Sequence, residues 1–182
     1  MNARRILART LMLALATTAL ATTGAQAAGD QGHADKIGRA GEAVEATRTI
    51  EVVMHDNYYE PETVNVNEGE TVRFVLRNKG ELLHEFNIGT AHMHEEHRAE
   101  MAVMMEHGML EPDRINHEMM KMDMGGGHTM AHDDPNSVLL EPGQDAEIVW
   151  TFSETGDLQF ACNIPGHYES GMVGDIHFGK GS

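Results

Sequence analysis

Cysteine, basic residues and long apolar runs are all scarce in this chain of 182 residues. Only 13 Lys and Arg residues oppose 29 Asp and Glu residues, which gives a formal net charge of −16. A polyanion of this kind is not expected to bind nucleic acid or an anionic membrane surface, whereas it can attract metal ions and basic partner proteins. The single cysteine, Cys162, excludes a disulfide bond within the chain.

The longest apolar run lies near the N-terminus and is too short to cross a membrane. It covers residues 11–20 and is interrupted by threonines, whereas a membrane-spanning helix needs about 20 apolar residues. Three arginines precede the run, and Ala25-Gln26-Ala27 follows it with the small-residue pattern of a cleavage site. We therefore predict a secretory signal peptide over 1–27 rather than a membrane anchor, with no membrane span left after cleavage.

The predicted export changes what is expected of the cysteine. Arg4-Arg5 is compatible with the twin-arginine route, although the motif around the pair is incomplete. Cleavage removes three arginines and no acidic residue, so the net charge falls from −16 to −19. A free exposed thiol is a liability in an oxidising compartment, so Cys162 is expected to be either buried or bound to a metal.

A histidine and a methionine follow the cysteine at regular spacing. His167 lies five residues after Cys162, and Met172 lies five residues after His167. A thiolate, an imidazole and a thioether are three of the four ligands of a blue-copper site, in which one cysteine and two histidines form a plane and a methionine binds weakly on its axis. A buried core cysteine is the alternative interpretation. The combination favours a copper site in this loop.

A second histidine is needed to complete the plane of such a site. His84 is the best candidate, because a turn within 78–88 delivers it onto the start of a strand with alternating apolar residues. His55 and His177 are alternatives, and each is more typical of a surface or strand-end position. The predicted metal ligands are therefore His84, Cys162, His167 and Met172.

Short segments of alternating polarity predict β-strands in two parts of the chain. Apolar and polar residues alternate over 48–90 and again over 135–178, and turn residues separate the runs. Several short strands divided by turns are typical of an all-β sandwich with a Greek-key order. Residues 28–47 are rich in Gly, Ala and charge without a firm period, so we expect a flexible leader before a domain over 48–182.

The segment between the two strand-rich parts has a different composition. Residues 91–132 contain seven of the 12 histidines and ten of the 14 methionines. We predict a helix from about Glu95 to Met109, a shorter helical piece near 113–122 and a flexible break at glycines 125–127. A segment this long inside a compact domain is usually functional or disordered.

The methionines of this insertion have two interpretations. Four of them fall on one face of the predicted helix and could cover the sandwich by packing, namely Met101, Met104, Met105 and Met109. Packing explains less well the four methionines within 119–124 and the histidines among the glycines. Thioethers select Cu(I) and imidazoles bind both copper states, so additional copper bound within 91–132 is a further prediction.

Together these residues resemble a single-domain cupredoxin of the plastocyanin and azurin type, with a ligand loop closer in spacing to auracyanin and rusticyanin. The resemblance rests on four motifs: Asn78 with His84-Glu85-Phe86, Pro142-Gly143, Trp150-Thr151-Phe152, and Cys162-x4-His167-x4-Met172. It covers most of 48–178 outside the insertion. It implies a Greek-key cupredoxin β-sandwich with one type 1 copper, to which the partly helical His/Met-rich insertion is an addition.

The export signal and the insertion further resemble the periplasmic cupredoxins of bacterial copper tolerance. We therefore expect a periplasmic type 1 copper protein that contributes to copper tolerance and exchanges Cu(I) and Cu(II). The alternative is a soluble electron-transfer cupredoxin whose insertion is a helical flap. Expected partners are copper ions and a periplasmic redox or copper-transfer protein. An enzymatic role is not expected, because one such domain lacks the further histidine clusters of multicopper enzymes.

Overall fold

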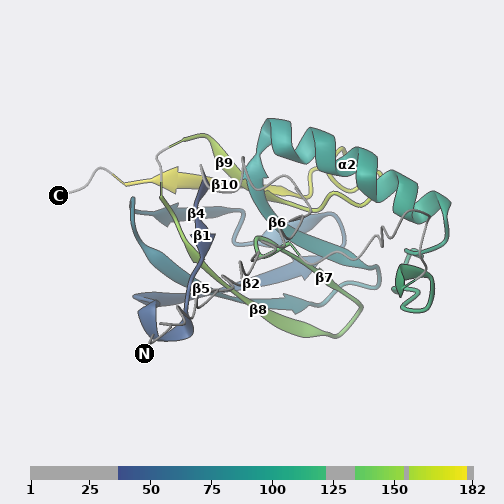
Figure 1. Cartoon of the computed structure of the whole chain (residues 1–182), viewed down its shortest axis with the longest axis horizontal. Helices are drawn as coiled ribbons and strands as arrows, with labels where there is room; N and C mark the ends of the chain where they lie inside the picture. Colours follow the sequence, from purple (N-terminus) through teal and green to yellow (C-terminus); the bar gives the residue numbers. More distant parts are fainter. Residues whose placement is uncertain (1–36, 122–133, 154–155, 180–182) are drawn as a thin grey trace, which may run out of the picture.

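The computed structural model describes residues 37–121, 134–153 and 156–179. Within these residues, ten strands form two five-stranded sheets that pack face to face as a sandwich (Figure 1). In the same part of the chain, no helix is long and apolar enough to cross a membrane. The predicted signal peptide lies outside the described residues. The prediction of an all-β sandwich with a partly helical insertion is confirmed.

The first sheet has the strand order β1-β8-β5-β2-β3. Of its neighbouring strands, β2 and β5 run parallel and the other pairs are antiparallel. The strands are β1 (Arg39–Ala40), β2 (Arg48–His55), β3 (Tyr58–Glu60), β5 (Thr71–Asn78) and β8 (Asp145–Thr151).

The alternation of apolar and polar side chains along β5 shows how the sequence determines which face of this sheet is buried. Its apolar side chains Val72, Phe74 and Leu76 are fully buried. Arg73 and Arg77 alternate with this set and point to the opposite face, because side chains alternate along a strand. There Arg77 forms an ion pair with Asp145 of the neighbouring β8 at 2.7 Å.

The second sheet has the order β4-β10-β9-β6-β7 and carries the candidate site. β4 and β10 are parallel, and the other neighbours are antiparallel. Because β6 and β9 are antiparallel neighbours with Asn87 opposite Ala161, the beginning of β6 and the end of β9 lie at the same end of the sandwich. The strands are β4 (Thr63–Val66), β6 (His84–Thr90), β7 (Ser137–Leu140), β9 (Leu158–Ala161) and β10 (Val173–Phe178).

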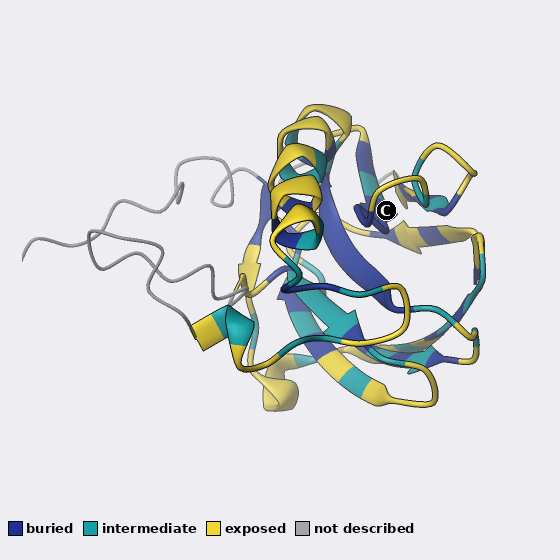
Figure 2. Ribbon diagram, turned by 90° about the vertical axis from the view of Figure 1, so that its right-hand side faces the viewer, coloured by how far each residue is buried: buried dark blue, intermediate teal, exposed yellow. Residues whose placement is uncertain are grey.

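Strands of the sandwich carry many buried residues, drawn dark blue in Figure 2. Among the buried residues, an aromatic cluster lies between the two sheets. Phe86 of β6 stacks on Phe160 of β9 with 5.3 Å between ring centroids, and it also contacts Phe74 of β5 at 5.4 Å. Tyr59 of β3 packs edge-on against Phe160 at 5.1 Å. Burial of large rings in such arrangements dominates core stability, so both sheets share one hydrophobic core.

The range predicted to be a flexible leader is structured in its second half. Ile37 is buried, and β1 pairs with the end of β8, followed by the short 3-10 helix η1 (Ala43–Glu45). A side chain at Gly38 would lie 2.3 Å from the carbonyl oxygen of Thr151, so only glycine allows this close approach. A strand of two residues leaves no periodic pattern in the sequence, and the predicted start of the domain at residue 48 is therefore too late. Residues 28–36 lie outside the described residues.

The insertion begins with the helix α2 (Ala91–Glu106), which follows β6 directly and packs against β6 and β9. Thr90 caps it by accepting a hydrogen bond from the backbone N–H of Met93 at 3.3 Å. The helix therefore begins four residues before the predicted start at Glu95. It ends at His107, before Gly108, whose φ of 70° lies in the left-handed region.

Packing accounts for the methionines on the inner face of α2. Met101 and Met104 of α2 are buried and Met105 packs against the core, and Met109, which follows the end of the helix, is buried as well. The packing interpretation of these four residues is thus confirmed. The second predicted helix, near 113–122, is reduced in the described residues to the 3-10 turn η2 (Met119–Lys121).

Candidate metal centre

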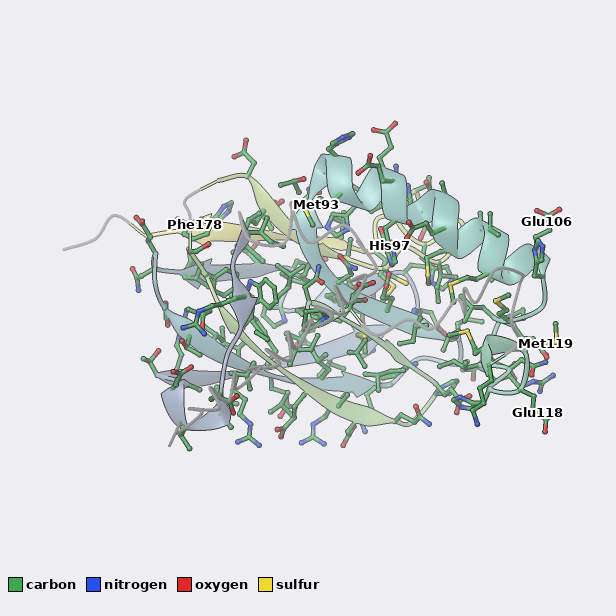
Figure 3. The ribbon with its side chains drawn as sticks, in the orientation of Figure 1. Met93, His97, Glu106, Glu118, Met119 and Phe178 are labelled. Atoms are coloured by element: carbon green, nitrogen blue, oxygen red, sulfur yellow. The ribbon has the colours of Figure 1, made fainter. Side chains whose placement is uncertain are left out.

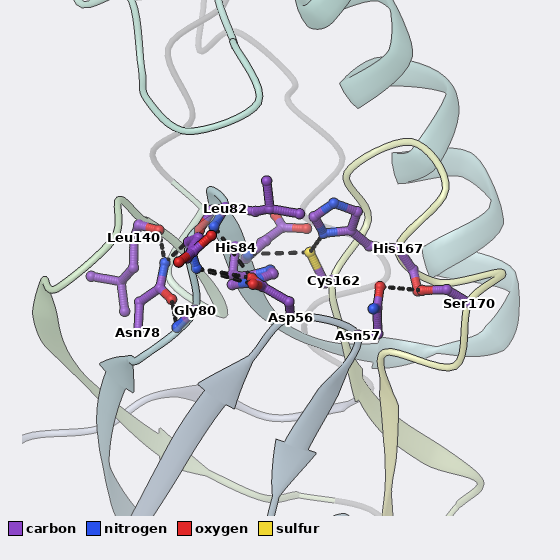
Figure 4. Close-up of polar contacts among 12 residues, drawn as sticks. Asp56, Asn57, Asn78, Gly80, Leu82, His84, Leu140, Cys162, His167 and Ser170 are labelled. Atoms are coloured by element: carbon purple, nitrogen blue, oxygen red, sulfur yellow. Dashed lines mark hydrogen bonds and ion pairs between the residues drawn. The ribbon is translucent and has the colours of Figure 1, made fainter.

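Three predicted ligands meet at one end of the sandwich (Figure 4). His84 begins β6, Cys162 directly follows β9, and His167 lies in the loop that leads to β10. One potential ligand atom from each lies within 4.8 Å of the other two. Cys162 Sγ and His167 Nδ1 are 3.3 Å apart. Cys162 and His84 are fully buried, whereas His167 is half-buried.

The fourth predicted ligand, Met172, is fully buried at the end of the same loop. Its carbonyl oxygen accepts a hydrogen bond from the Cys162 backbone N–H at 3.2 Å, and its own N–H donates to the His167 carbonyl at 3.0 Å. Gly166 and Gly171 take φ values of 89° and 102°, which favour glycine. The loop is therefore closed on itself, with the backbone of Met172 beside that of Cys162.

The two alternative histidines lie elsewhere. His55, on β2, stacks on Tyr58 at 4.6 Å between centroids and lies 3.6 Å from Glu60. His177 is exposed on β10. Among the described residues, the cluster of potential ligands contains His84 and neither of these.

Asp56 determines which nitrogen of His84 is free. Its Oδ1 lies 2.9 Å from His84 Nε2, and His84 Nδ1 is buried without a hydrogen-bond partner among the described residues. Burial lowers the pKa of His84, although the Asp56 carboxylate opposes this. A neutral ring that donates Nε2–H to Asp56 keeps its lone pair on Nδ1, the arrangement in which a carboxylate orients a metal-binding histidine.

Asp56 is itself held as a carboxylate at the turn after β2. Burial alone would raise its pKa, but the backbone N–H groups of Glu81 and Leu82 together with His84 lower it below its usual value. Both N–H groups donate to the carboxylate at 3.1 to 3.2 Å. A side chain at Gly80 would lie 2.2 Å from Asp56 Oδ1, so glycine at this position allows the contact.

Asn78 fixes the loop that carries His84 (Figure 4). Its buried side chain donates from Nδ2 to the carbonyl oxygens of Leu82 and Leu140, both at 2.8 Å. Its Oδ1 accepts from the backbone N–H of Gly80 at 2.9 Å. These bonds join the 78–84 loop to the end of β7, because a buried amide is most stable when its donors and acceptors are all engaged.

The Cys162 thiol has an environment that disfavours its anion in the absence of a metal. Burial raises the pKa of Cys162 far above its usual value, and the Glu85 carboxylate raises it further. The backbone N–H of Glu85 donates to Cys162 Sγ at 3.3 Å, which favours the thiolate weakly by comparison. A metal cation supplies the missing positive charge, because metal binding displaces the thiol proton.

Glu85 is a buried carboxylate beside the site. The sequence interpretation gave it no role. Its side chain is 0% exposed and accepts hydrogen bonds from Asn163 at 2.9 and 3.1 Å and from Ser137 Oγ at 2.6 Å. His97 Nε2, from α2, lies 2.8 Å from Glu85 Oε1. Glu85 thus connects three elements: β6, which begins with His84, the loop that follows Cys162, and the helix α2.

His97 is the cationic partner of this carboxylate and lies on the side of α2 that faces the sandwich (Figure 3). Burial would lower its pKa, but the hydrogen bonds and charges of Glu85 and Glu100 outweigh burial and raise the pKa to about 9. The next residue, Arg98, lies over the ring of Tyr168 at 4.3 Å and pairs with Glu169 at 3.3 Å. Side chains of α2 therefore hold the ligand loop from two points.

The remaining histidines of the insertion differ in their surroundings. Buried His94 has its pKa lowered to about 4, chiefly because burial disfavours the charged ring. His92 is exposed beside Glu95 and Glu96. His107, at the end of α2, and His117 are both exposed. The two other histidines of the insertion and three of its methionines lie outside the described residues: His128, His132, Met122, Met124 and Met130.

A model of the cupredoxin-like domain family matches residues 10–114, which is more than half of the chain. The chain belongs to the cupredoxin-like family. The predicted family is thereby confirmed, although the matched range of this cupredoxin ends before the 162–172 loop. Evidence on that loop comes from its geometry.

Two relatives of this cupredoxin are copper-resistant cuproproteins named CopI. The protein from Pseudomonas aeruginosa is 51% identical over 150 residues, which cover 79% of this chain and 83% of the relative. The protein from Rubrivivax gelatinosus is 41% identical over 140 residues, which cover 76% and 71%. Among solved structures, auracyanin B aligns with a TM-score of 0.56 at 16% identity, over 79% of this chain and 96% of its own. At that identity the likeness concerns the fold alone.

Proposed function

We propose that this cupredoxin binds one copper ion as a type 1 site through His84, Cys162, His167 and Met172. The observation that carries the proposal is the meeting of two imidazoles and one buried thiol within 4.8 Å. A soft thiolate with two imidazoles and a weak thioether suits copper and matches no common structural site for zinc, which takes four strong ligands. The unpartnered Nδ1 of His84 offers a ready lone pair.

Copper bound there supplies one-electron exchange between Cu(II) and Cu(I). The chain holds the donors in one geometry, because Asn78 and Asp56 fix the loop of His84 and the closed 162–172 loop fixes the rest. Donors held in a geometry intermediate between those that Cu(I) and Cu(II) prefer would need little rearrangement when the copper gains or loses an electron. His167 is the half-buried donor, so it gives electrons their shortest path to the surface.

The physiological role that we infer is copper tolerance in the periplasm after export, rather than electron transport alone. Two CopI relatives named for copper resistance support this role. The insertion supports it as well, since several of its sulfur donors are only half-buried, including Met119 and Met120. Partners would then be copper ions and a periplasmic protein that exchanges copper or electrons. The alternative role is a soluble electron carrier with the same type 1 site.

Copper stoichiometry separates the two roles. Deleting 91–132 is a poor test, because α2 contributes buried methionines to the core and His97 to Glu85. We instead expect the mature protein to bind more than one Cu(I) per chain. Simultaneous Met→Leu substitution at positions 119, 120, 122 and 124 should then lower that number while the type 1 visible absorption stays unchanged.

The matched control for this variant is Met101→Leu with Met104→Leu, which makes the same side-chain change in the buried core. It should change neither the number of bound Cu(I) ions nor the type 1 visible absorption. Copper would be counted by elemental analysis after anaerobic loading and gel filtration. A count of one per chain for the unmodified protein in both redox states would favour the electron carrier and overturn the tolerance role.

A further inference from the structure

We propose that Asp56 is a positioning residue for the copper site, and that it lowers the reduction potential by acting through His84. The proposal rests on the proposed type 1 site. Its structural basis is the 2.9 Å contact between Asp56 Oδ1 and His84 Nε2, on the side of the ring opposite Nδ1. Among the described residues, Asp56 forms a hydrogen bond or ion pair with His84 but with none of the other three proposed ligands.

The turn that carries Asp56 is built to hold this carboxylate in place. Two backbone N–H groups from the 80–82 loop donate to it, and Gly80 leaves the space it needs. The next residue, Asn57, has a φ of 76° and accepts a hydrogen bond from Ser170 Oγ at 3.1 Å. The β2–β3 turn therefore touches both segments that carry proposed ligands, the 78–84 loop and the 162–172 loop (Figure 4).

The chemical effect follows from the charge of Asp56. A carboxylate that accepts the Nε2 proton increases the electron density of the imidazole and makes Nδ1 a stronger donor. A stronger donor stabilises the more highly charged Cu(II) over Cu(I). The side chain of Asp56 is 35% exposed, whereas His84 is 0% exposed. Solvent screens the carboxylate in part, but the hydrogen bond to the buried ring is not replaced by water.

Asp56→Asn removes the charge and can keep the geometry. Oδ1 of Asp56 already accepts from Glu81 N, Leu82 N and His84 Nε2. An asparagine with its oxygen in that place retains these three donors. Its Nδ2 takes the position of Oδ2, so only the second contact of the Glu81 N–H, to Oδ2 at 3.1 Å, is lost. The variant thus separates the carboxylate charge from the hydrogen bond.

We expect Asp56→Asn to raise the reduction potential of the copper site. Loss of such an orienting partner typically costs 10–100-fold in metal affinity. A tenfold loss confined to Cu(II) raises the one-electron potential by about 59 mV, and because Asp56→Asn keeps the hydrogen bond, a shift of up to about this size is predicted. Gly80→Ala, whose new Cβ would collide with Asp56 Oδ1, should shift the potential in the same direction.

Glu81→Gln is the matched control. Glu81 lies in the same loop, is exposed and uses only its backbone N–H toward Asp56. It removes an equal charge without touching His84, so its shift should be much smaller than that of Asp56→Asn. Potentials would be measured by spectroelectrochemistry on the full mature protein. Equal shifts for the two variants, or no shift for Asp56→Asn, would overturn the proposal.

A metal-free measurement tests the same contact independently. Imidazole ¹⁵N chemical shifts should show His84 as the Nε2–H tautomer in the unmodified protein and in Asp56→Asn, and as a mixture in Asp56→Ala. An unchanged tautomer in Asp56→Ala would also count against the positioning role. Failure of the proposed function would look different, because the unmodified protein would then lack the thiolate-to-copper absorption altogether.

Discussion

Cys162 is the residue on which the proposed chemistry depends most. The thiol is fully buried, and burial together with the nearby Glu85 carboxylate raises its pKa far above its usual value. It is therefore protonated and unreactive at neutral pH without a metal, because only the thiolate is a nucleophile or a strong ligand. A bound cation would convert the thiol into the thiolate ligand that the proposed type 1 site requires for its absorption.

Cys162→Ser is expected to abolish the intense visible absorption of the copper-loaded protein. A serine hydroxyl is a hard and weak donor that does not replace a thiolate for copper, and it retains nearly the same volume. Ser170→Ala, an exposed position in the same loop, is the control and should keep the colour. If the absorption persisted in Cys162→Ser, the ligand assignment would be wrong.

The residues of the site differ in how well a sequence can indicate them. Cys162, His167 and Met172 share one loop, so their spacing alone suggests that they bind the same metal ion. His84 could be proposed because the chemistry requires a second histidine. Asp56 and Glu85 could not, since their roles depend on contacts with residues that are far away in sequence, as between Asp56 and His84.

At the scale of elements, α2 is an integral part of the end of the sandwich that carries the proposed copper site. It buries methionines in the core, and His97 and Arg98 hold Glu85 and the ligand loop. The sequence indicates the helix through its methionine spacing, but it does not show that β6 passes directly into it at Thr90. The two-residue strand β1 left no period at all, so its pairing with β8 could not be foreseen.

The His97–Glu85 pair makes the stability of the metal-free protein depend on pH. Folding raises the pKa of His97 from 6.5 to about 9, so the folded state binds the proton more tightly. This stabilisation is full below about pH 6.5 and is lost as pH rises through about 9. A shift of this size corresponds to about 3 kcal/mol of unfolding free energy.

We expect His97→Gln to lose most of that pH dependence. Glutamine can still donate a hydrogen bond to Glu85 but carries no charge, so the variant should be less stable than the unmodified protein near pH 6 and closer to it above pH 9. Urea unfolding of the metal-free proteins across this range measures the difference. His107→Gln, at the exposed end of the same helix, should leave the dependence unchanged, and a constant difference for His97→Gln would contradict the prediction.

At the scale of the whole molecule, the proposed metal site lies at one end of the hydrophobic core, to which the buried Cys162 and Met172 both belong. The aromatic cluster joins both sheets without any proposed ligand as a member, whereas the ligands lie at one end where β6 begins and β9 ends. A metal bound there would close the loops at that end but would not be required to bring the sheets together. Copper should therefore add to a fold that already exists.

Removal of copper is accordingly expected to lower the melting temperature without unfolding the protein. A ligand at about 1,000 times its dissociation constant stabilises the folded state by about 4 kcal/mol. For a domain of this size that corresponds to a rise of roughly 8–16 °C, taking about 2–4 °C per kcal/mol. Circular dichroism of the chelated protein should retain the β-sheet signal, and added copper should restore the higher melting temperature. Cys162→Ser should show only a small copper-dependent shift, because it lacks the thiolate that closes the site. Loss of the β-sheet signal on chelation would instead mean that copper is needed for the sandwich to fold.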